Sequence, residues 1–324
     1  MNIVAADWLP YSLPLRRPWQ TSRGVFDVRQ GRLLRLIDDG ARQAWGDCAP
    51  LPEFGIDESA ATAFAEETAM LDLAAQKAQQ PLNAWLSGKP PVESVAVNGN
   101  LGSLSSIKDD ALKQALATGY SILKIKVGIG DWRAEVAHLQ RLKNLLPRGS
   151  LFRLDANAAW KMDEASAFVM ACADLPIESL EEPLSQPTPA GLASLQGLAS
   201  FPLAVDESIQ LLDAPFFYHP PVRRLVLKPA RHGGLLATIG LALKAQARGI
   251  ECVVSSGLES ACGLLACAHL AAAIAPWQTH GLGTAEWLAE DTGASPPVSA
   301  GRLILPRGTG LGFVPGLTQA ARKP

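Results

Sequence analysis

The stretch Leu123-Lys124-Ile125-Lys126-Val127-Gly128 decides the fold, because it has the apolar pattern of a buried strand and yet carries two lysines. Residues two apart on a strand point to the same face, so Lys124 and Lys126 lie together. Charged groups are costly to bury alone, so a strand that carries them inward needs opposite charges nearby. Later apolar segments end on further charged residues, namely Asp155, Glu181, Asp206 and Lys228. We therefore expect these strand ends to meet in one place.

From Val92 onward, short apolar segments alternate with helical stretches. This rhythm is typical of a parallel sheet covered on both faces, and seven or eight such units fit a (β/α) barrel with one degenerate unit. An open doubly wound sheet is the alternative, but no Gly-x-Gly-x-x-Gly follows the first strand. The predicted strands are Val95–Val97, Ile122–Val127, Leu151–Leu154, Ile177–Leu180, Leu203–Val205, Arg224–Leu227, Glu251–Val254 and a weak one at His280–Leu282.

The first 92 residues have a different character, which indicates an α+β capping domain. We expect strands at Ile3–Trp8, Gly31–Asp38 and Arg42–Asp47, turns at 29–31 and 38–40, and a helix that follows Asp57 and runs to Gln79. The predicted fold class is therefore α/β: a modified TIM-type barrel (residues 93–294) with an N-terminal α+β capping domain (1–92). The tail, 295–324, contains the strand-like Arg302–Leu305 and is expected to pack on the capping domain.

The three carboxylates predict a metal site. Active sites of barrels lie at the carboxyl ends of the strands, where Asp155, Glu181 and Asp206 are expected. Hard oxygen ligands suit Mg²⁺, and the lack of cysteine and histidine in this set argues against zinc. The alternative is that these residues cap helices or form ion pairs, which would explain any one of them but explains three consecutive strand ends poorly.

The lysines predict proton transfer. A second ammonium group and a cation both lower a lysine pKa, so Lys126 or Lys124 can act as a base near neutral pH. Lys228 is expected to enter the site from the opposite side. A metal beside a lysine base suits removal of a proton next to a substrate carboxylate. The alternative is an exposed strand face with both lysines in water.

Composition excludes several classes of protein. The net charge of −2 does not indicate the basic surface that binding to nucleic acid or an anionic membrane requires, and no apolar run is long enough to span a bilayer. The N-terminus lacks a secretory pattern, and the five cysteines contain no Cys-x-x-Cys pair. We expect a cytoplasmic protein with reduced thiols that acts on a small-molecule carboxylate. The oligomeric state is open, and a monomer is compatible with the sequence.

Several short motifs occur in an order and spacing that resemble the enolase superfamily and, within it, the o-succinylbenzoate synthases of menaquinone biosynthesis. The resemblance covers nearly the whole chain. The motifs are Trp45-Gly46-Asp47-Cys48-Ala49-Pro50, Lys124-Ile125-Lys126, Asp155-Ala156-Asn157, Glu181-Glu182-Pro183, Asp206-Glu207-Ser208, Lys228-Pro229 and Ser255-Ser256-Gly257.

The resemblance implies a role for each of these residues. Mg²⁺, with Mn²⁺ as a substitute, would be bound by Asp155, Glu181 and Asp206, with Glu181 rather than Glu182 as the ligand. In a syn-dehydration of 2-succinyl-6-hydroxy-2,4-cyclohexadiene-1-carboxylate to 2-succinylbenzoate, Lys126 would remove the proton and return it to the departing hydroxyl. Lys228 would stabilise the enediolate electrostatically and Lys124 would tune Lys126. The remaining implied contacts are Ser255, Ser256 and Gly257 at the succinyl end, and the loop Trp19–Gly24 over the site.

Some features leave alternatives open. Dipeptide epimerases and N-succinylamino acid racemases of the same superfamily use the same lysines and carboxylates; Lys228-Pro229 favours the synthase, because the epimerases tend to read Lys-x-Gly-Gly there. Gly283 replaces an aspartate that many relatives carry. A non-catalytic, metal-stabilised binding protein is the alternative of a different class. Arg153 either supports Asp155 or forms an ion pair, and Asn157 either supports the site or forms a turn. Arg231 and His232 are expected to be exposed to solvent in a loop.

Overall fold

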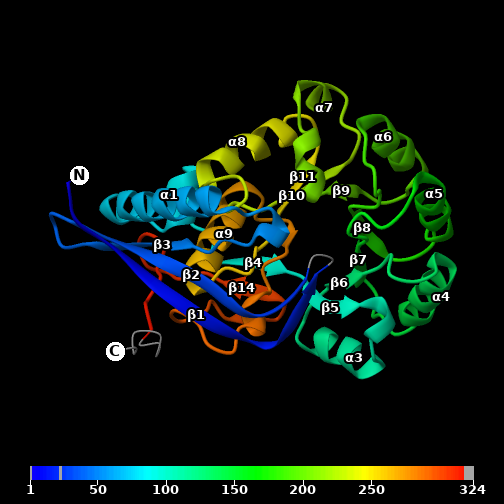
Figure 1. The fold of residues 1–324 in the computed structure, drawn as a ribbon, viewed down its shortest axis with the longest axis horizontal. Helices are drawn as coiled ribbons and strands as arrows, with labels where there is room; N and C mark the ends of the chain where they lie inside the picture. Colours follow the sequence, from blue (N-terminus) through cyan, green and yellow to red (C-terminus); the bar gives the residue numbers. More distant parts are fainter. Residues whose placement is uncertain (1, 22–23, 317–324) are drawn as a thin grey trace.

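The computed structural model describes residues 2–21 and 24–316. It confirms the predicted class, because a curled seven-stranded parallel sheet forms most of a barrel with helices around its outside (Figure 1). The strand order is β11-β10-β9-β8-β7-β6-β5. The strands are β5 (Gly99–Ser103), β6 (Ile122–Lys126), β7 (Leu151–Asp155), β8 (Ile177–Glu181), β9 (Leu203–Val205), β10 (Arg224–Leu227) and β11 (Glu251–Val254).

A second, four-stranded sheet closes the barrel. Its order is β12-β4-β14-β13, and β12 (Thr279–His280) runs parallel to β4 (Ser94–Val97). The Gly281 N–H donates to the Val254 carbonyl at 2.8 Å, which joins β12 to β11. Since β4 leads through Asn98 directly into β5, the ring of strands is complete. The weak strand expected near His280 is present, although it is only two residues long.

The strand beside β6 was not predicted. The structure pairs β5 with β6, whereas the predicted first strand, Val95–Val97, belongs to β4 in the closing sheet. Glycine, asparagine and serine are depleted in strands, so the sequence Gly-Asn-Leu-Gly-Ser of β5 carries no strand signal. Pairing with the strong neighbour β6 overrides this weak local preference.

Helices cover the outer face of the barrel (Figure 1). One of them, α9 (Ala261–Ile274), is buried almost throughout because it is packed between β11 and the capping domain. Within the described residues, no helix combines the length and the apolar character needed to cross a membrane. The helices that follow the barrel strands are α3 (Asp109–Ala117), α4 (Trp132–Lys143), α5 (Met162–Ala171), α6 (Pro189–Leu198), α7 (Ala214–Tyr218), α8 (Leu235–Gln246) and α9.

The capping region is an antiparallel sheet with helices on one side. Its strands are β1 (Ile3–Thr21), β2 (Gly24–Asp38) and β3 (Gln43–Cys48), and its helices are α1 (Glu58–Lys77) and α2 (Leu82–Ser87). The predicted strand Ile3–Trp8 is therefore too short. The strand continues through Pro10 because β1 is an edge strand, and an edge strand tolerates prolines since its outer N–H groups have no partner to lose.

The turn predicted at residues 29–31 is wrong, because these residues lie inside β2. Gly31 pairs with Tyr11, and a Cβ at Gly31 would lie 2.4 Å from the Tyr11 hydroxyl oxygen. Glycine is thus required here by a close approach of strands rather than by a turn. The long β1–β2 hairpin reaches from the capping sheet to the mouth of the barrel (Figure 1). Of the predicted closing loop Trp19–Gly24, residues 22 and 23 lie outside the described residues.

The tail contacts both parts of the chain. The predicted strand is present as β14 (Arg302–Ile304), which pairs with β4 of the barrel, with β13 (Val298–Ser299) on its other side. Further on, the Leu311 N–H donates to Asp72 of α1 at 2.7 Å. We propose the division at residues 92 and 93 as the domain boundary, with the tail bridging both domains. All five cysteines are buried and unpaired.

Candidate active site

The predicted site residues come together at the carboxyl ends of adjacent strands. Strand pairing places Lys126 beside Asp155 and Asp155 beside Glu181, while Asp206 and Lys228 directly follow β9 and β10. One cavity is lined by all six predicted lysines and carboxylates together with Asn157, Ser255 and Ser256. Arg153 and Gly257 do not line it.

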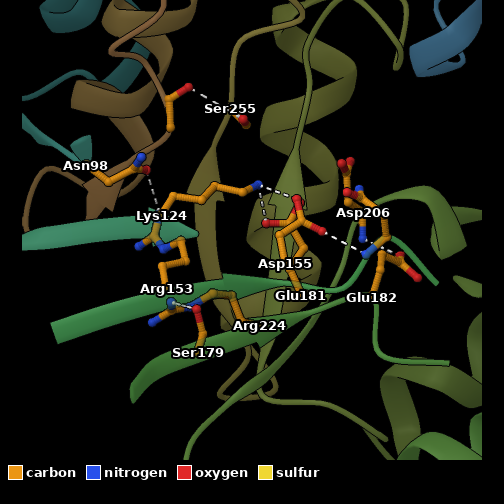
Figure 2. Close-up of polar contacts among 12 residues, drawn as sticks. Asn98, Lys124, Arg153, Asp155, Ser179, Glu181, Glu182, Asp206, Arg224 and Ser255 are labelled. Atoms are coloured by element: carbon orange, nitrogen blue, oxygen red, sulfur yellow. Dashed lines mark hydrogen bonds and ion pairs between the residues drawn. The ribbon is translucent and has the colours of Figure 1, made fainter. Parts of the chain in front are cut away.

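Lys124 lies between two carboxylates. Its ammonium group is 2.8 Å from Asp155 Oδ2 and 2.7 Å from Glu181 Oε2, and Figure 2 shows it reaching across to both. Burial alone would lower the pKa of Lys124, but the charges of Asp155 and Glu181 raise it above its usual value. Burial and the neighbouring Asp155 raise the pKa of Glu181 to about 8. Lys124 is therefore held as a cation against a pair of carboxylates that repel each other.

Lys126 differs from Lys124 in its partners. Among the described residues it forms no ion pair within 4.0 Å, although it is largely buried. Burial and the neighbouring charge of Lys124 lower its pKa, against the opposing effect of Asp155. A lysine with a lowered pKa can accept a proton near neutral pH, so Lys126 has the properties of a general base.

Lys228 lies on the other side of the cavity, in a close ion pair with Asp206. Its Nζ is also 5.2 Å from the centre of the Phe54 ring, which belongs to the capping region. Arg231 NH1 binds Asp206 Oδ1 at 2.6 Å. Burial would raise the pKa of Asp206, but Lys228 and Arg231 lower it, so this carboxylate stays charged.

The expectation that Arg231 and His232 are solvated is wrong. The Arg231 side chain is 8% exposed, and its Nε donates to the Phe54 carbonyl at 2.8 Å. Arg231 therefore connects Asp206 of the barrel to the capping region and holds these two parts of the site together. His232 is largely buried, and burial together with Arg231 lowers its pKa to about 4, so it is neutral.

The neighbouring acidic residues separate into two groups. Glu182 accepts hydrogen bonds from the Asp206 and Ser208 N–H groups at 2.6 and 2.7 Å and from the Ser208 hydroxyl at 2.6 Å, so its oxygens face away from the cavity. Glu181 faces the cavity, as the resemblance implied. Glu207 also lines the cavity and was not predicted, although its place directly after Asp206 could have indicated it. Burial and the charge of Asp206 raise its pKa to about 7.

The Ser255–Gly257 segment differs from its expected role. The three N–H groups already donate, to Leu227 O, Gly281 O and Glu259 Oε1. The Ser256 hydroxyl donates to Glu259 Oε2 at 2.5 Å and accepts from the Leu258 N–H and the Thr284 hydroxyl. Only the Ser255 hydroxyl, with one weak 3.5 Å contact to Gly281 O, has capacity to bind a ligand. The predicted donors are thus present but engaged within the protein.

Asn157 and Arg153, the two residues considered as supports for the site, have different contacts. The Asn157 N–H donates to Asp155 Oδ1 at 3.0 Å with a positive φ of 44°, so Asn157 forms a turn that orients a carboxylate. Arg153 does not support Asp155: it binds Glu178 in a bidentate ion pair, and Arg224 binds the same carboxylate. Arg153, Glu178 and Arg224 form what we call the arginine cluster, below the active site. Of the alternatives for Arg153, the ion pair is therefore correct.

Other cavity residues were missed or only partly recognised. Glu53 and Phe54 come from the 3-10 helix Pro52–Phe54 of the capping region, and Asn98 and Asn100 flank the start of β5. Their positions depend on how the two parts of the chain pack together, which no local pattern shows. Trp19 also lines the cavity, whereas Trp160 packs on Phe168 in the core.

The donor set fits a hard divalent cation. Within the described residues no three acidic, cysteine or histidine side chains form a ready cage, because the Lys124 and Lys228 ammonium groups lie among the carboxylates. The Lys124 ammonium nevertheless shows that Asp155 and Glu181 can bind one cation between them. Since Glu181 is difficult to ionise without a positive charge nearby, binding of Mg²⁺ by Asp155, Glu181 and Asp206 is chemically reasonable.

Comparison with known proteins gives relatives over nearly the whole chain. The family model described as "Enolase C-terminal domain-like" matches residues 107–317. An o-succinylbenzoate synthase of Edwardsiella ictaluri is 33% identical over 292 residues, covering 85% of this chain and 88% of that protein. The L-Ala-D/L-Glu epimerase of Bacillus subtilis is 25% identical over 313 residues, covering 84% of this chain and 85% of that protein.

Solved structures share the fold. That of the Bacillus subtilis epimerase, in a substrate-liganded complex, superposes with a TM-score of 0.86 at 22% identity, over 97% of this chain and 99% of that one. A dipeptide epimerase of Cytophaga hutchinsonii, complexed with Mg and the dipeptide D-Ala-L-Val, has a TM-score of 0.84 at 20% identity, over 99% of this chain and 98% of that one. From the family match and the sequence relatives together, this chain belongs to the enolase superfamily.

Proposed function

We propose that this protein is an o-succinylbenzoate synthase that uses Mg²⁺ to dehydrate 2-succinyl-6-hydroxy-2,4-cyclohexadiene-1-carboxylate. The observation that supports this choice over a dipeptide epimerase is the part of the cavity wall where Gly283 lies with Ser255, Ser256 and Thr284, because Gly283 brings no carboxylate to this position. The α-ammonium of a dipeptide needs an acidic partner when it is buried. Glu259, behind this wall, has both oxygens engaged by Ser256 and Gly257.

The two lysines are also unequal, which supports a reaction with one base. Epimerisation in both directions needs, on each side of the reacting carbon, a group that can both accept and donate a proton, but Lys228 is ion-paired with Asp206 and Arg231 fixes the same carboxylate. Lys126 has no such partner among the described residues. The ion pair with Asp206 places Lys228 to stabilise negative charge on the substrate.

Each residue then has a defined task in the dehydration. Lys126 Nζ removes the proton next to the ring carboxylate and returns it to the hydroxyl group, which leaves as water while the ring gains its third double bond. Lys228 stabilises the negative charge that develops, and Lys124 holds Asp155 and Glu181 in place while it lowers the proton affinity of Lys126. Mg²⁺ would neutralise charge on the substrate carboxylate. We propose Asp155, Glu181 and Asp206 as its ligands.

The test is an assay of the purified protein with Mg²⁺ on three substrate classes: the cyclohexadiene, N-succinylamino acids and a dipeptide panel. We expect aromatic product from the first, measured by its ultraviolet absorbance. Lys228→Arg keeps the charge but not a usable base, so it should retain part of the dehydration activity and lose any racemisation. Racemisation without dehydration would contradict the proposal and favour the N-succinylamino acid racemase.

A further inference from the structure

Asp47 is a buried carboxylate that the proposed reaction does not use. It lies in β3 of the capping region, and its side chain does not line the active-site cavity. Burial raises its pKa to about 6, against the hydrogen bonds of Tyr11 and Ser260 and the charge of Arg29. Because this pKa lies above the ordinary value of 3.8, ionised Asp47 lowers the stability of the fold at neutral pH. Stability alone therefore does not account for a carboxylate at this position.

The contacts of Asp47 lead from the capping region into the barrel. Its Oδ1 accepts a hydrogen bond from the Tyr11 hydroxyl of β1 at 2.8 Å. Its Oδ2 accepts both the N–H and the hydroxyl of Ser260, each at 2.9 Å. Ser260 ends the segment 255–260 between β11 and α9, which we call the β11–α9 loop. Asp47 thus fixes the point at which this loop enters the buried helix α9.

A second buried residue of the capping region holds the same loop. Arg29 Nε donates to the Leu258 carbonyl at 2.9 Å, while its other nitrogens donate to carbonyl groups within the capping region. Leu258 has a φ of +62°, in the left-handed region that a leucine rarely adopts. A strained backbone of this kind persists only where its surroundings fix it. The contacts at Leu258 and Ser260 provide that constraint.

Glu259 lies between these two contacts and connects them to the active site. The Ser256 hydroxyl donates to Glu259 Oε2 at 2.5 Å, and the Gly257 N–H donates to Oε1 at 2.8 Å. Gly257 also lies close to the capping region, since a Cβ there would be 2.4 Å from Ile56 Cδ1. Three residues of the loop line the active-site cavity, namely Ser255, Ser256 and Leu258. The β11–α9 loop is therefore a wall of the cavity that the capping region holds from behind.

We propose that Asp47 is a positioning residue, which binds Ser260 and so holds the β11–α9 loop in the conformation that contacts the substrate. A carboxylate is suited to this task because its two oxygens accept from Tyr11 and from both donors of Ser260 at once, whereas an amide has only one acceptor oxygen. Hydrogen bonds to a charged acceptor are also the stronger ones. The proposal goes beyond the proposed function, since it applies to any substrate that the cavity wall contacts.

Two measurements on the full-length protein test this: amide hydrogen exchange of the β11–α9 loop, and steady-state kinetics with Mg²⁺. In Asp47→Asn the loop amides should exchange at least about tenfold faster, because local opening of the loop becomes easier. KM should rise about tenfold while kcat stays within about threefold, because a wall that binds the substrate and its transition state alike contributes to KM. Thermal unfolding shows whether the variant is folded.

Asp72→Asn is the matched control. Asp72 is also a buried carboxylate beside β3, and burial raises its pKa. Its hydrogen-bond partners, the N–H groups of Trp45 and Leu311 and the Gln76 side chain, lie outside the β11–α9 loop. Loop exchange and KM should therefore stay within about twofold in this variant. If Asp47→Asn does not fold, Ser260→Ala removes only the hydroxyl contact, and it should raise loop exchange and KM about threefold.

The outcomes separate this proposal from the proposed function. Equal loop exchange in the Asp47→Asn and Asp72→Asn proteins would overturn the positioning role. Faster loop exchange in Asp47→Asn with an unchanged KM would overturn it as well, because the loop would then not contact the substrate. If the unaltered protein converts an N-succinylamino acid or a dipeptide instead of the cyclohexadiene, only the proposed function is wrong, and KM is measured with that substrate. If it converts none of them, both proposals are wrong.

Discussion

The arginine cluster and the active site are built on the same two strands, yet their charges are arranged in opposite ways. Strand β7 contributes Arg153 to the cluster and Asp155 to the site, and β8 contributes Glu178 and Glu181. Burial would raise the pKa of Glu178, but Arg153 and Arg224 lower it to about 2. Burial beside Asp155 instead raises the pKa of Glu181 to about 8.

The difference shows which buried charges stabilise the fold and which serve chemistry. Guanidinium groups bind a carboxylate through a planar pair of donors and stay charged, so the arginine cluster has one preferred arrangement. Lysines provide a compact charge on a flexible stem, and their pKa shifts readily on burial. The site therefore contains carboxylates that a bound cation would stabilise further. It also contains a lysine that can lose its proton.

The largest effect should follow from removing the base. We expect Lys126→Ala to lower kcat by about 10²- to 10⁴-fold, the usual contribution of general acid–base catalysis. Stability should be unchanged or slightly higher, because burial already disfavours this ammonium and no ion pair of Lys126 is found among the described residues. Steady-state assays and thermal unfolding measure the two outcomes. Full activity in this variant would show that Lys126 is not the base, whereas no turnover in the unaltered protein would favour the non-catalytic binding protein.

The opposite pattern is expected in the arginine cluster. Glu178→Gln leaves two buried guanidinium groups without their shared negative charge, and a pKa moved from 4.5 to about 2 corresponds to about 3 kcal/mol of unfolding free energy. Urea unfolding should show this loss, while kcat of the folded protein stays near its original value. Glu251→Gln is the control: its partly exposed side chain also pairs with Arg224, and it should cost less than about 1 kcal/mol.

The loss in Glu178→Gln should depend on pH. The pKa of Glu178 is depressed in the folded state, so its stabilising effect is complete above pH 4.5 and disappears as the pH falls through about 2. The difference in unfolding free energy between the two proteins should thus be constant from pH 8 to pH 5 and shrink toward pH 2. A difference that stays constant down to pH 2 would show that Glu178 acts through packing instead of charge.

The barrel was predictable because β6 to β11 are short, apolar and regularly spaced, so local pattern and tertiary role agree. Strand β5 could not be predicted in this way, because Gly99–Ser103 pairs with β6 despite a composition that disfavours strands. The length of β1 was underestimated for a related reason: whether a proline can be accommodated depends on an edge position, which only the assembled sheet defines.

Within the site, the strand-end residues could be placed from sequence because strand direction alone puts them at the mouth. Arg231 could not, because its contact with the Phe54 carbonyl crosses from the barrel to the capping region. The Ser255–Gly257 donors were recognised as groups, but their engagement by Leu227, Gly281 and Glu259 depends on three separate segments meeting. Sequence locates donors, and only the packed structure shows which are still free.

The adjacent Glu181 and Glu182 allow a sharper comparison. We expect Glu181→Gln to weaken Mg²⁺ binding by at least about tenfold to a hundredfold. Loss of a residue that only supports a metal ligand already weakens metal binding by about 10- to 100-fold, and Glu181 is proposed as a ligand itself. Glu182→Gln should affect Mg²⁺ less, and it should lower stability because Glu182 binds two N–H groups and the Ser208 hydroxyl. Calorimetric Mg²⁺ titration and urea unfolding separate the two. A larger Mg²⁺ effect from Glu182→Gln would reverse the assignment.

The smallest expected effect concerns the contact between the capping region and Lys228. Phe54→Leu removes a ring 5.2 Å from Lys228 Nζ but keeps the Phe54 carbonyl that binds Arg231. A cation–π contact of this kind is worth about 0.5 to 1 kcal/mol, so kcat should fall about threefold. Phe217→Leu, whose ring packs on Phe216, serves as the control. A fall of a hundredfold would mean that the Phe54 ring contacts the substrate itself, whereas no fall would show that the ion pair with Asp206 alone positions Lys228.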